Sequence, residues 1–202
     1  MEKPNYSFLL ILFNLFFLIP SAQNVADLEV FEKAMKPEAV LTYEVSMSGK
    51  KYQFIATIKK LEDEIVFDWK TTDPINKTGI VTMNATSVSK ADALFNDFAN
   101  GESKLEKETA LFISKKIFGD VRANFQAALK VNGQGDTATI MGSTVAEFGV
   151  NINGEFLSIP GWELQGGSEI KYTLGVIESQ KFPLITRIDL GWTMLLSEIK
   201  NP

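Results

Sequence analysis

The sequence predicts a mostly β (α+β) fold: a single curved antiparallel sheet or half-open barrel of about ten strands, with an N-terminal helix and two short insert helices. Two observations predict this class. Apolar and polar residues alternate along most of the chain, which is typical of strands that bury one face of a sheet. Turn sequences separate the alternating runs, the strongest being Asn153-Gly154. A long, twisted sheet of this kind closes into a barrel or curls around a helix.

The first expected elements are a helix and a run of strands. Val25, Leu28, Phe31 and Met35 recur every three or four residues, and Pro37 ends the pattern, so a helix is expected here. Alternation then predicts strands at 41–47, 52–58, 65–71 and 78–84.

Two insert helices are expected in the middle of the chain. The first lies around Ala91 to Phe98, between the capping-box-like Ser89–Asp92 and the stop signal Asn100-Gly101. The second runs from Lys115 to Ala123, with Ser114 as its N-cap.

The rest of the chain is expected to be strand and turn. The charged stretch 103–108 is expected to be exposed, and Pro160-Gly161-Trp162 and Gly166-Gly167 are expected to bracket a loop. The remaining strands are expected at 109–113, 125–131, 137–141, 148–152, 155–159, 170–176, 184–190 and 192–199. No repeat or long linker divides the chain, so residues 23–202 are expected to form a single β-rich half-barrel domain.

The first 22 residues predict a secretory signal peptide. Phe8 to Ile19 is an apolar run broken only by Asn14, and small residues follow it. The run is too short for a membrane span, so cleavage between Ala22 and Gln23 is expected to leave no integral membrane segment.

The composition limits both the compartment and the partners. The chain has no cysteine, so it has no disulfide and no site for a lipid anchor, which favours the periplasm, the cell surface or the outside of a Gram-negative bacterium. The net charge is −5, and Arg122 and Arg187 are the only arginines, so nucleic acid is not an expected partner.

The absence of both histidine and cysteine excludes most catalytic machinery. Ser-His-Asp and Cys-His catalysis are impossible, and so are metal sites built on these ligands; no cofactor is expected. The acidic trio Glu62-Asp63-Glu64 has the oxygen ligands that Ca²⁺ prefers, but a solvated hairpin turn explains it better. Ser87 to Lys90 has the Ser-x-x-Lys spacing and is interpreted as part of a helix cap.

Carboxylate chemistry stays open as an alternative. Asp68 lies beside Trp69, an arrangement that suits one acid of a glycosidase pair next to a sugar-stacking ring. Asp73, Asp189 or Glu147 would be the second acid. The competing interpretation places all of these acids on the solvated face of the strands.

Five aromatic residues are the candidate ligand contacts: Trp69, Phe95, Phe98, Trp162 and Trp192. Trp69 and Trp192 fall on expected strands, where large rings fill the core. Trp162 falls in the expected Pro/Gly loop, where an exposed ring would mark a contact surface. One modification is also considered: Asp136-Thr137-Ala138, at a turn, looks like a bacterial O-glycosylation acceptor.

Several stretches carry a family resemblance. They are Phe67 to Pro74, the strand led by Gly79, Ala93 to Asn96 with Phe98 and Gly101-Glu102, Thr109 to Ser114, and Phe182 to Ile185 leading to Leu195 and Ile199. The whole resembles secreted bacterial half-barrel proteins of uncharacterised function, and is similar in outline to the open barrels of Lol-type lipoprotein carriers. The resemblance implies a half-barrel fold and assigns no functional residue.

The expected function is an exported, non-enzymatic binding or carrier module with an apolar concave sheet face, suited to a lipid-like ligand. Apolar residues on both faces of some strands motivate it: Val81 and Met83 against Ile80, and Phe54 against Ile55. An envelope protein–protein interaction module, acting through an edge strand or the Trp162 loop, is the alternative. A carboxylate-dependent hydrolase is the third hypothesis.

Overall fold

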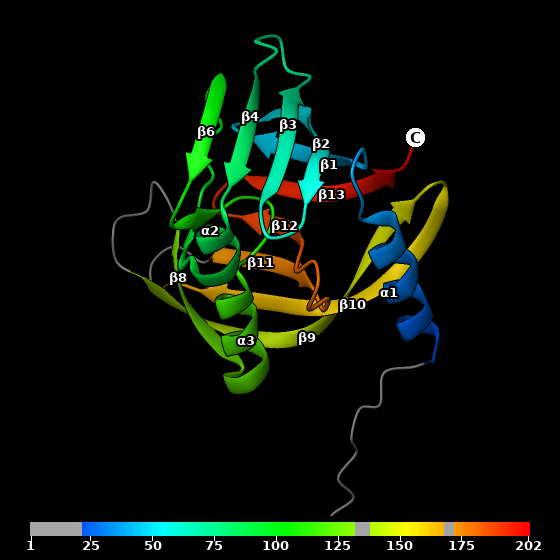
Figure 1. The fold of residues 1–202 in the computed structure, drawn as a ribbon, viewed down its shortest axis with the longest axis vertical. Coiled ribbons are helices and arrows are strands. Elements are labelled where there is room, and N and C mark those ends of the chain that lie inside the picture. The colour runs from blue at the N-terminus through cyan, green and yellow to red at the C-terminus, as the bar shows by residue number, and fades with distance from the viewer. Residues whose placement is uncertain (1–21, 132–137, 168–171) are drawn as a thin grey trace, which may run out of the picture.

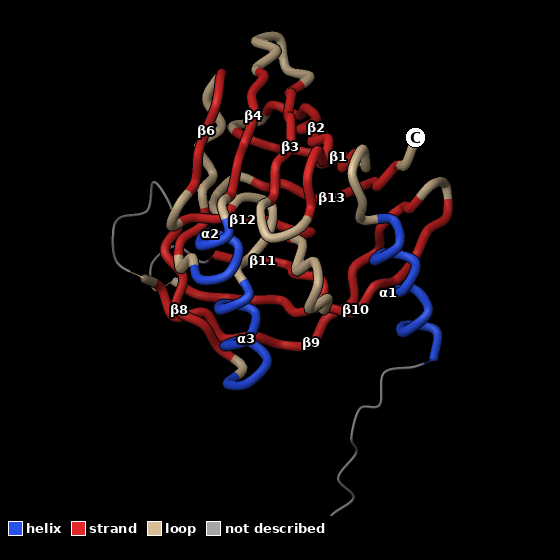
Figure 2. Tube along the Cα trace, in the orientation of Figure 1, coloured by secondary structure: helices blue, strands red, loops and turns tan. Residues whose placement is uncertain are grey.

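A computed structural model describes residues 22–131, 138–167 and 172–202 (Figure 1). Strands make up most of the described chain, with three helices beside them (Figure 2). In chain order the elements are α1 (Ala22–Ala34), β1 (Val40–Met47), β2 (Lys50–Leu61), β3 (Ile65–Thr71), β4 (Thr78–Met83), α2 (Ala85–Lys90), β5 (Ala93–Leu94), β6 (Gly101–Leu105), β7 (Glu108–Thr109), α3 (Lys115–Asn124), β8 (Gln126–Val131), β9 (Thr139–Ile152), β10 (Glu155–Gly166), β11 (Tyr172–Ile177), β12 (Ile185–Asp189) and β13 (Thr193–Lys200).

All the strands belong to one 13-stranded sheet, in the order β6-β4-β3-β2-β1-β13-β12-β11-β10-β9-β8-β5-β7. The mostly β prediction is confirmed, but the sheet has more strands than the ten expected and is mixed rather than purely antiparallel. Parallel pairs join β4 to β6, β5 to β7 and to β8, and β13 to β9. The β13–β9 pair closes a partial ring of five strands, β9 to β13.

The first and last strands of this order, β6 and β7, lie next to each other along the chain. β6 and β7 are separated only by Glu106 and Lys107, yet β6 pairs with β4 and β7 pairs with β5. Figure 1 shows β2, β3, β4 and β6 crossing the direction of β9 to β13. Buried side chains from both groups form one hydrophobic cluster, so the sheet rolls around its own core.

Inside this core, Tyr43 links two strands that are far apart in sequence and lie on either side of β13. Its hydroxyl, on β1, donates to the main-chain oxygen of Ile185 at the start of β12, at 2.9 Å. The side chain is fully buried, and burial raises the pKa of the phenol above its ordinary value. A buried hydroxyl needs such a partner, because an unpaired one costs about 1–3 kcal/mol.

The N-terminal helix is confirmed as α1 and packs against β10 (Figure 1). Phe31 and Met35 are buried in the core. The Asp27 carboxylate accepts from the main-chain N–H of Ser158 at 3.0 Å. Signal cleavage at Ala22 stays a prediction, and residues 1–21 lie outside the described chain, as do Asp136 and Thr137 of the glycosylation hypothesis.

The helix expected around Ala91 to Phe98 is wrong. The helix in this region is α2, which precedes it: Asn84 caps it by accepting from the N–H of Ser87 at 2.8 Å, and it ends at Lys90. The following chain forms β5, which pairs with β7 and β8, so tertiary pairing overrides the local helical pattern. The second insert helix is confirmed as α3, with Ser114 as its N-cap.

The hairpin at Asn153-Gly154 is confirmed; both residues have positive φ, 53° and 93°, as the turn requires. The loop expected from Pro160 onward is wrong, since Pro160, Gly161 and Trp162 continue β10. The N–H of Glu178 donates to the Pro160 oxygen at 2.9 Å, so the main chain of Pro160 faces β11. Its missing N–H falls just outside the β10–β11 ladder, which begins at Gly161.

Gly161 is required by close packing. A Cβ at this position would lie 2.3 Å from the Val176 oxygen and 2.6 Å from the Phe148 ring. Pro160 and Gly161 therefore fit within a strand. Pro160 lies where no ladder N–H is needed, and Gly161 lies where there is no room for a side chain.

Tyr43→Phe is expected to lower the free energy of unfolding by about 1–3 kcal/mol, because it leaves the buried Ile185 oxygen unpaired. In the unaltered protein, stability should also fall as the pH rises past 10.0, the ordinary tyrosine pKa. Above that pH the unfolded chain releases a proton that folded Tyr43 retains. The unfolded state is thereby stabilised, and the free energy of unfolding falls. Urea denaturation between neutral pH and about pH 11 measures both effects. Equal stability and an equal alkaline slope in the variant would contradict the role of Tyr43.

Candidate functional site

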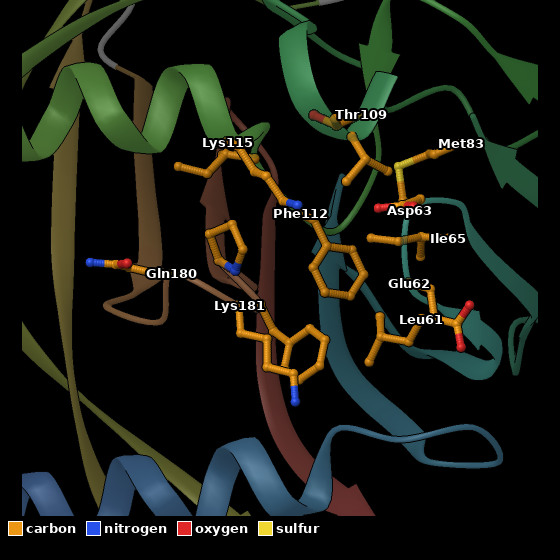
Figure 3. A pocket seen from close by; sticks show the side chains of 14 residues that line it. Leu61, Glu62, Asp63, Ile65, Met83, Thr109, Phe112, Lys115, Gln180 and Lys181 are labelled. Carbon is orange, nitrogen blue, oxygen red and sulfur yellow. The ribbon is translucent and has the colours of Figure 1, made fainter. Parts of the chain in front are cut away.

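A cleft of about 440 Å³ lies beside the start of α3 (Figure 3). Its volume falls within the range of small-molecule pockets in proteins. The turn between β2 and β3, the end of β4, α2, the start of α3 and the loop before β12 all contribute to it. The floor is apolar, and its main residues are Leu61, Ile65, Met83, Val88, Phe112 and Phe182.

Main-chain bonds join the two segments that carry the phenylalanines. Phe112 forms a bridge with Leu184, and the N–H of Ile113 donates to the Pro183 oxygen at 3.1 Å. The N–H of Ile185 donates to the Leu111 oxygen at 2.8 Å. The segment before α3 and the segment before β12 therefore form one wall of the cleft.

Leu111 adopts a backbone conformation that bulky residues rarely use. Its φ is 61°, and its side chain is buried. A left-handed conformation costs an L-residue roughly 1–2 kcal/mol, so the burial and the bond to Ile185 must hold it. Leu111 directly precedes Phe112, which lines the cleft.

Two buried serines fix the helices beside this wall. The Ser87 hydroxyl on α2 donates to the main-chain oxygen of Glu108. The Ser114 hydroxyl donates to the Ala91 oxygen at 2.6 Å and accepts from the N–H of Ile117 at 3.2 Å. Ser114 therefore fixes the start of α3, where Lys115 meets the cleft.

The rim of the cleft carries charges of both signs on opposite sides. Figure 3 shows Glu62 and Asp63 on the side of the β2–β3 turn, and Lys115 and Lys181 across the opening. All four are exposed, and none forms an ion pair with another residue of the described ranges. The Lys181 ammonium lies 5.0 Å from the centre of the Phe182 ring.

Glu64, the third acid of this turn, is paired with Lys60. Glu64 accepts a hydrogen bond from Lys60 at 3.0 Å, and this bond is the main cause that raises the pKa of the Lys60 ammonium. Within the described part of the chain, no group of three or more acidic side chains is placed to hold a metal ion.

Three of the five predicted contact residues gather in one aromatic cluster. Trp69 stacks on Phe54 at 5.5 Å, and Phe98 lies 4.6 Å from Phe54 and 5.4 Å from Trp69, measured between ring centres. Phe95 joins through Phe98 at 5.4 Å. Phe54 and Trp69 are buried in the core, Phe95 and Phe98 are half-buried against it, and none of the four rings lines the cleft.

The other two predicted contacts lie elsewhere. Trp162 is buried rather than exposed, and its ring packs edge-on against Phe125 at 5.8 Å. Its indole N–H has no hydrogen-bond partner in the described chain. Trp192 is half-buried in the turn between β12 and β13. A role for any of the five in ligand binding stays a prediction.

The candidate acids of the hydrolase hypothesis each have a separate partner. Asp68 forms an ion pair with Lys59 at 3.7 Å. Asp189 pairs with Arg187 at 3.3 Å, and Asp73 accepts from the Thr71 hydroxyl. Glu147, on β9, accepts from Ser158 at 2.8 Å. None of these acids lines the cleft.

Ser87 and Lys90, the residues with the Ser-x-x-Lys spacing, are also not arranged for catalysis. Ser87 is fully buried, and its hydroxyl donates to the main-chain oxygen of Glu108. Lys90 is exposed at the end of α2.

Comparison of the chain with protein-family models, with curated proteins and with solved structures gives no match. The half-barrel resemblance is therefore supported only in its coarse form, as a large mixed, mostly antiparallel sheet with a partial ring of five strands. No helix in the described ranges is long and apolar enough to cross a membrane.

Sequence reasoning missed the residues of the cleft, although it touched several of them. Glu62-Asp63 was identified as an acidic turn, and Phe182-Pro183 contributed to the resemblance. Nothing in the local pattern placed these two segments together, because about 120 residues separate them. A Lys-Phe-Pro run outside any expected strand, at Lys181, is the signal that most nearly pointed to an exposed wall.

Ser114→Ala is expected to destabilise the protein by about 1–3 kcal/mol, because it removes the N-cap of α3 and leaves the buried Ala91 oxygen unpaired. Ser89→Ala is the matched control, since the Ser89 hydroxyl bonds only to carbonyls of its own helix. Its effect should stay within about 0.5 kcal/mol. Urea denaturation measures both, and equal losses would show that Ser114 is not a special attachment point.

Proposed function

We propose that the protein is an exported, non-enzymatic binding module that holds the apolar part of a lipid-like ligand in the cleft beside α3. The observation that supports it is the cleft itself, which has a volume of about 440 Å³, an apolar floor and a rim of charged side chains. Apolar pockets with a few polar groups at the edge suit amphipathic small molecules. This cleft lies where several segments meet and not on the concave sheet face, which side chains fill.

The rim suits the polar end of such a ligand. Glu62 and Asp63 face Lys115 and Lys181 across the opening, and these exposed charges have no ion-pair partner among the described residues. A head group at the mouth would remain in water and meet charges of either sign, while its chain contacts Phe112 and the other floor residues. Charge on the ligand is therefore expected to tune its affinity, and chain length to dominate it.

Export is part of the proposal and follows from the apolar run at 8–19 and the small residues after it. The protein–protein alternative relies on an edge strand or on an exposed Trp162 loop. Trp162 is buried in a strand, so the second of these surfaces does not form. The hydrolase alternative is disfavoured by the separate partners of its acids.

Binding is tested by titrating the protein with decanol, decanoate and decyltrimethylammonium in a calorimeter. Binding is expected with a negative heat-capacity change, the signature of apolar burial. Each methylene removed from the chain should weaken the affinity about fourfold, corresponding to about 0.8 kcal/mol. Absence of measurable binding for all three ligands would contradict the proposal.

Val88→Phe locates the site. Val88 is on the floor of the cleft, so the larger ring should fill the space and weaken binding by about tenfold or more. Val145→Phe is the matched control: this valine lies on β9, is 61% exposed and does not line the cleft. Equal affinity in both variants would place the ligand elsewhere.

A further inference from the structure

The strand β6 forms one edge of the sheet. It pairs in parallel with β4, and no described strand pairs with its other side. In Figure 1 it is the outermost arrow beside β4. Phe98, from the segment that leads into β6, packs on the inner face with Trp69. The outer edge of β6 is therefore free to pair with another strand.

The hydrogen-bond pattern shows which residues face this edge. The N–H of Asn84, directly after β4, donates to the Leu105 oxygen at 3.2 Å, so the main-chain groups of Leu105 face β4. Alternate residues of a strand direct these groups to the same side. Those of Ser103 face β4 as well, and those of Glu102 and Lys104 face the open edge.

The side chains of the edge residues are free. Glu102 and Lys104 are exposed, and neither forms an ion pair within the part of the chain that the structure describes. They lie on the outer face of the sheet, because Leu105, of opposite parity, is buried. The edge therefore presents one acidic and one basic residue, two positions apart, beside unpaired main-chain groups.

This edge is complementary to itself, and we infer that β6 pairs with the β6 of a second copy of this chain. In an antiparallel pair about a two-fold axis at Ser103, Glu102 of each copy lies opposite Lys104 of the other. The edge-facing groups then form about four main-chain hydrogen bonds, and two cross-strand ion pairs form on the outer face. The interface is isologous, as expected for a two-fold dimer.

The charges also disfavour other arrangements. A two-fold axis at Glu102 would place the two glutamates opposite each other, and an axis at Lys104 would oppose the lysines. A parallel, in-register pair would oppose like charges at both positions. Like charges directly opposite one another destabilise a strand pair, so the arrangement centred on Ser103 is selected.

The strand is short, so the dimer is expected to be weak, with a dissociation constant on the order of 0.1 mM. Sedimentation velocity from about 10 µM to 1 mM covers this range. The unaltered protein is expected to dimerise over it. A sedimentation coefficient that stays at the monomer value throughout would overturn the inference.

Charge reversals test the register. Glu102→Lys alone and Lys104→Glu alone should each weaken the dimer about tenfold or more, because each strand then carries charges of a single sign. An equal mixture of the two variants should dimerise again, since one strand is acidic and the other basic. Recovery in the mixture also shows that both variants are folded.

Lys107→Glu is the matched control. It makes the same change of charge three residues along the chain, at an exposed position between β6 and β7. It should dimerise like the unaltered protein. A mixture of the two edge variants that remains monomeric, or a loss in Lys107→Glu equal to that in Lys104→Glu, would rule out the β6 pair as the contact.

Discussion

The need to bury one face of a very long sheet is the constraint on which this structure depends. A twisted sheet of 13 strands does not remain open and flat, because its apolar face would stay in water. Here β9 to β13 form a partial ring, and the remaining strands continue until the two ends of the order meet on the stretch 101–109. A buried polar bond, from the Tyr43 hydroxyl to the Ile185 oxygen, ties β1 to β12, the two strands on either side of β13.

The cleft is a consequence of how the sheet is completed. Near the stretch 101–109, the regular ladder gives way to two-residue strands, a six-residue helix and connecting loops. These segments cover most of the apolar core but leave a cleft that Phe112 and Phe182 help to line. Binding sites are common in such connecting segments, because a rigid scaffold fixes them while their own sequence is free to vary.

The same incomplete closure explains the free edge. Glu106 and Lys107 connect β6 to β7, which pairs with β5 at the other end of the sheet order. The outer side of β6 therefore has no strand partner within the described chain. Natural sheets protect edges with short strands and charges. In β6 the alternation of Glu102 and Lys104 serves this purpose against most strands while matching an inverted copy of itself.

Local patterns were sufficient for much of the fold and for little of the site. Period-2 alternation predicts β1 to β4, and the Asn153-Gly154 turn predicts the β9–β10 hairpin, because these features depend on residues close in sequence. Helix α3 follows from Ser114 and its apolar stripe. The helix expected at 91–98 fails because β5 gains its main-chain partners from β7 and β8.

The sequence by itself determined that the chain is mostly strand, that a helix precedes the sheet, and that histidine and cysteine chemistry is absent. Only the tertiary structure decided that Trp162 is buried, that the sheet rolls until its ends meet, and that Phe112 and Phe182 come together to line a cleft. The physical reason is range: periodicity reports which face of a segment is apolar, whereas pairing across a hundred residues decides which apolar faces meet.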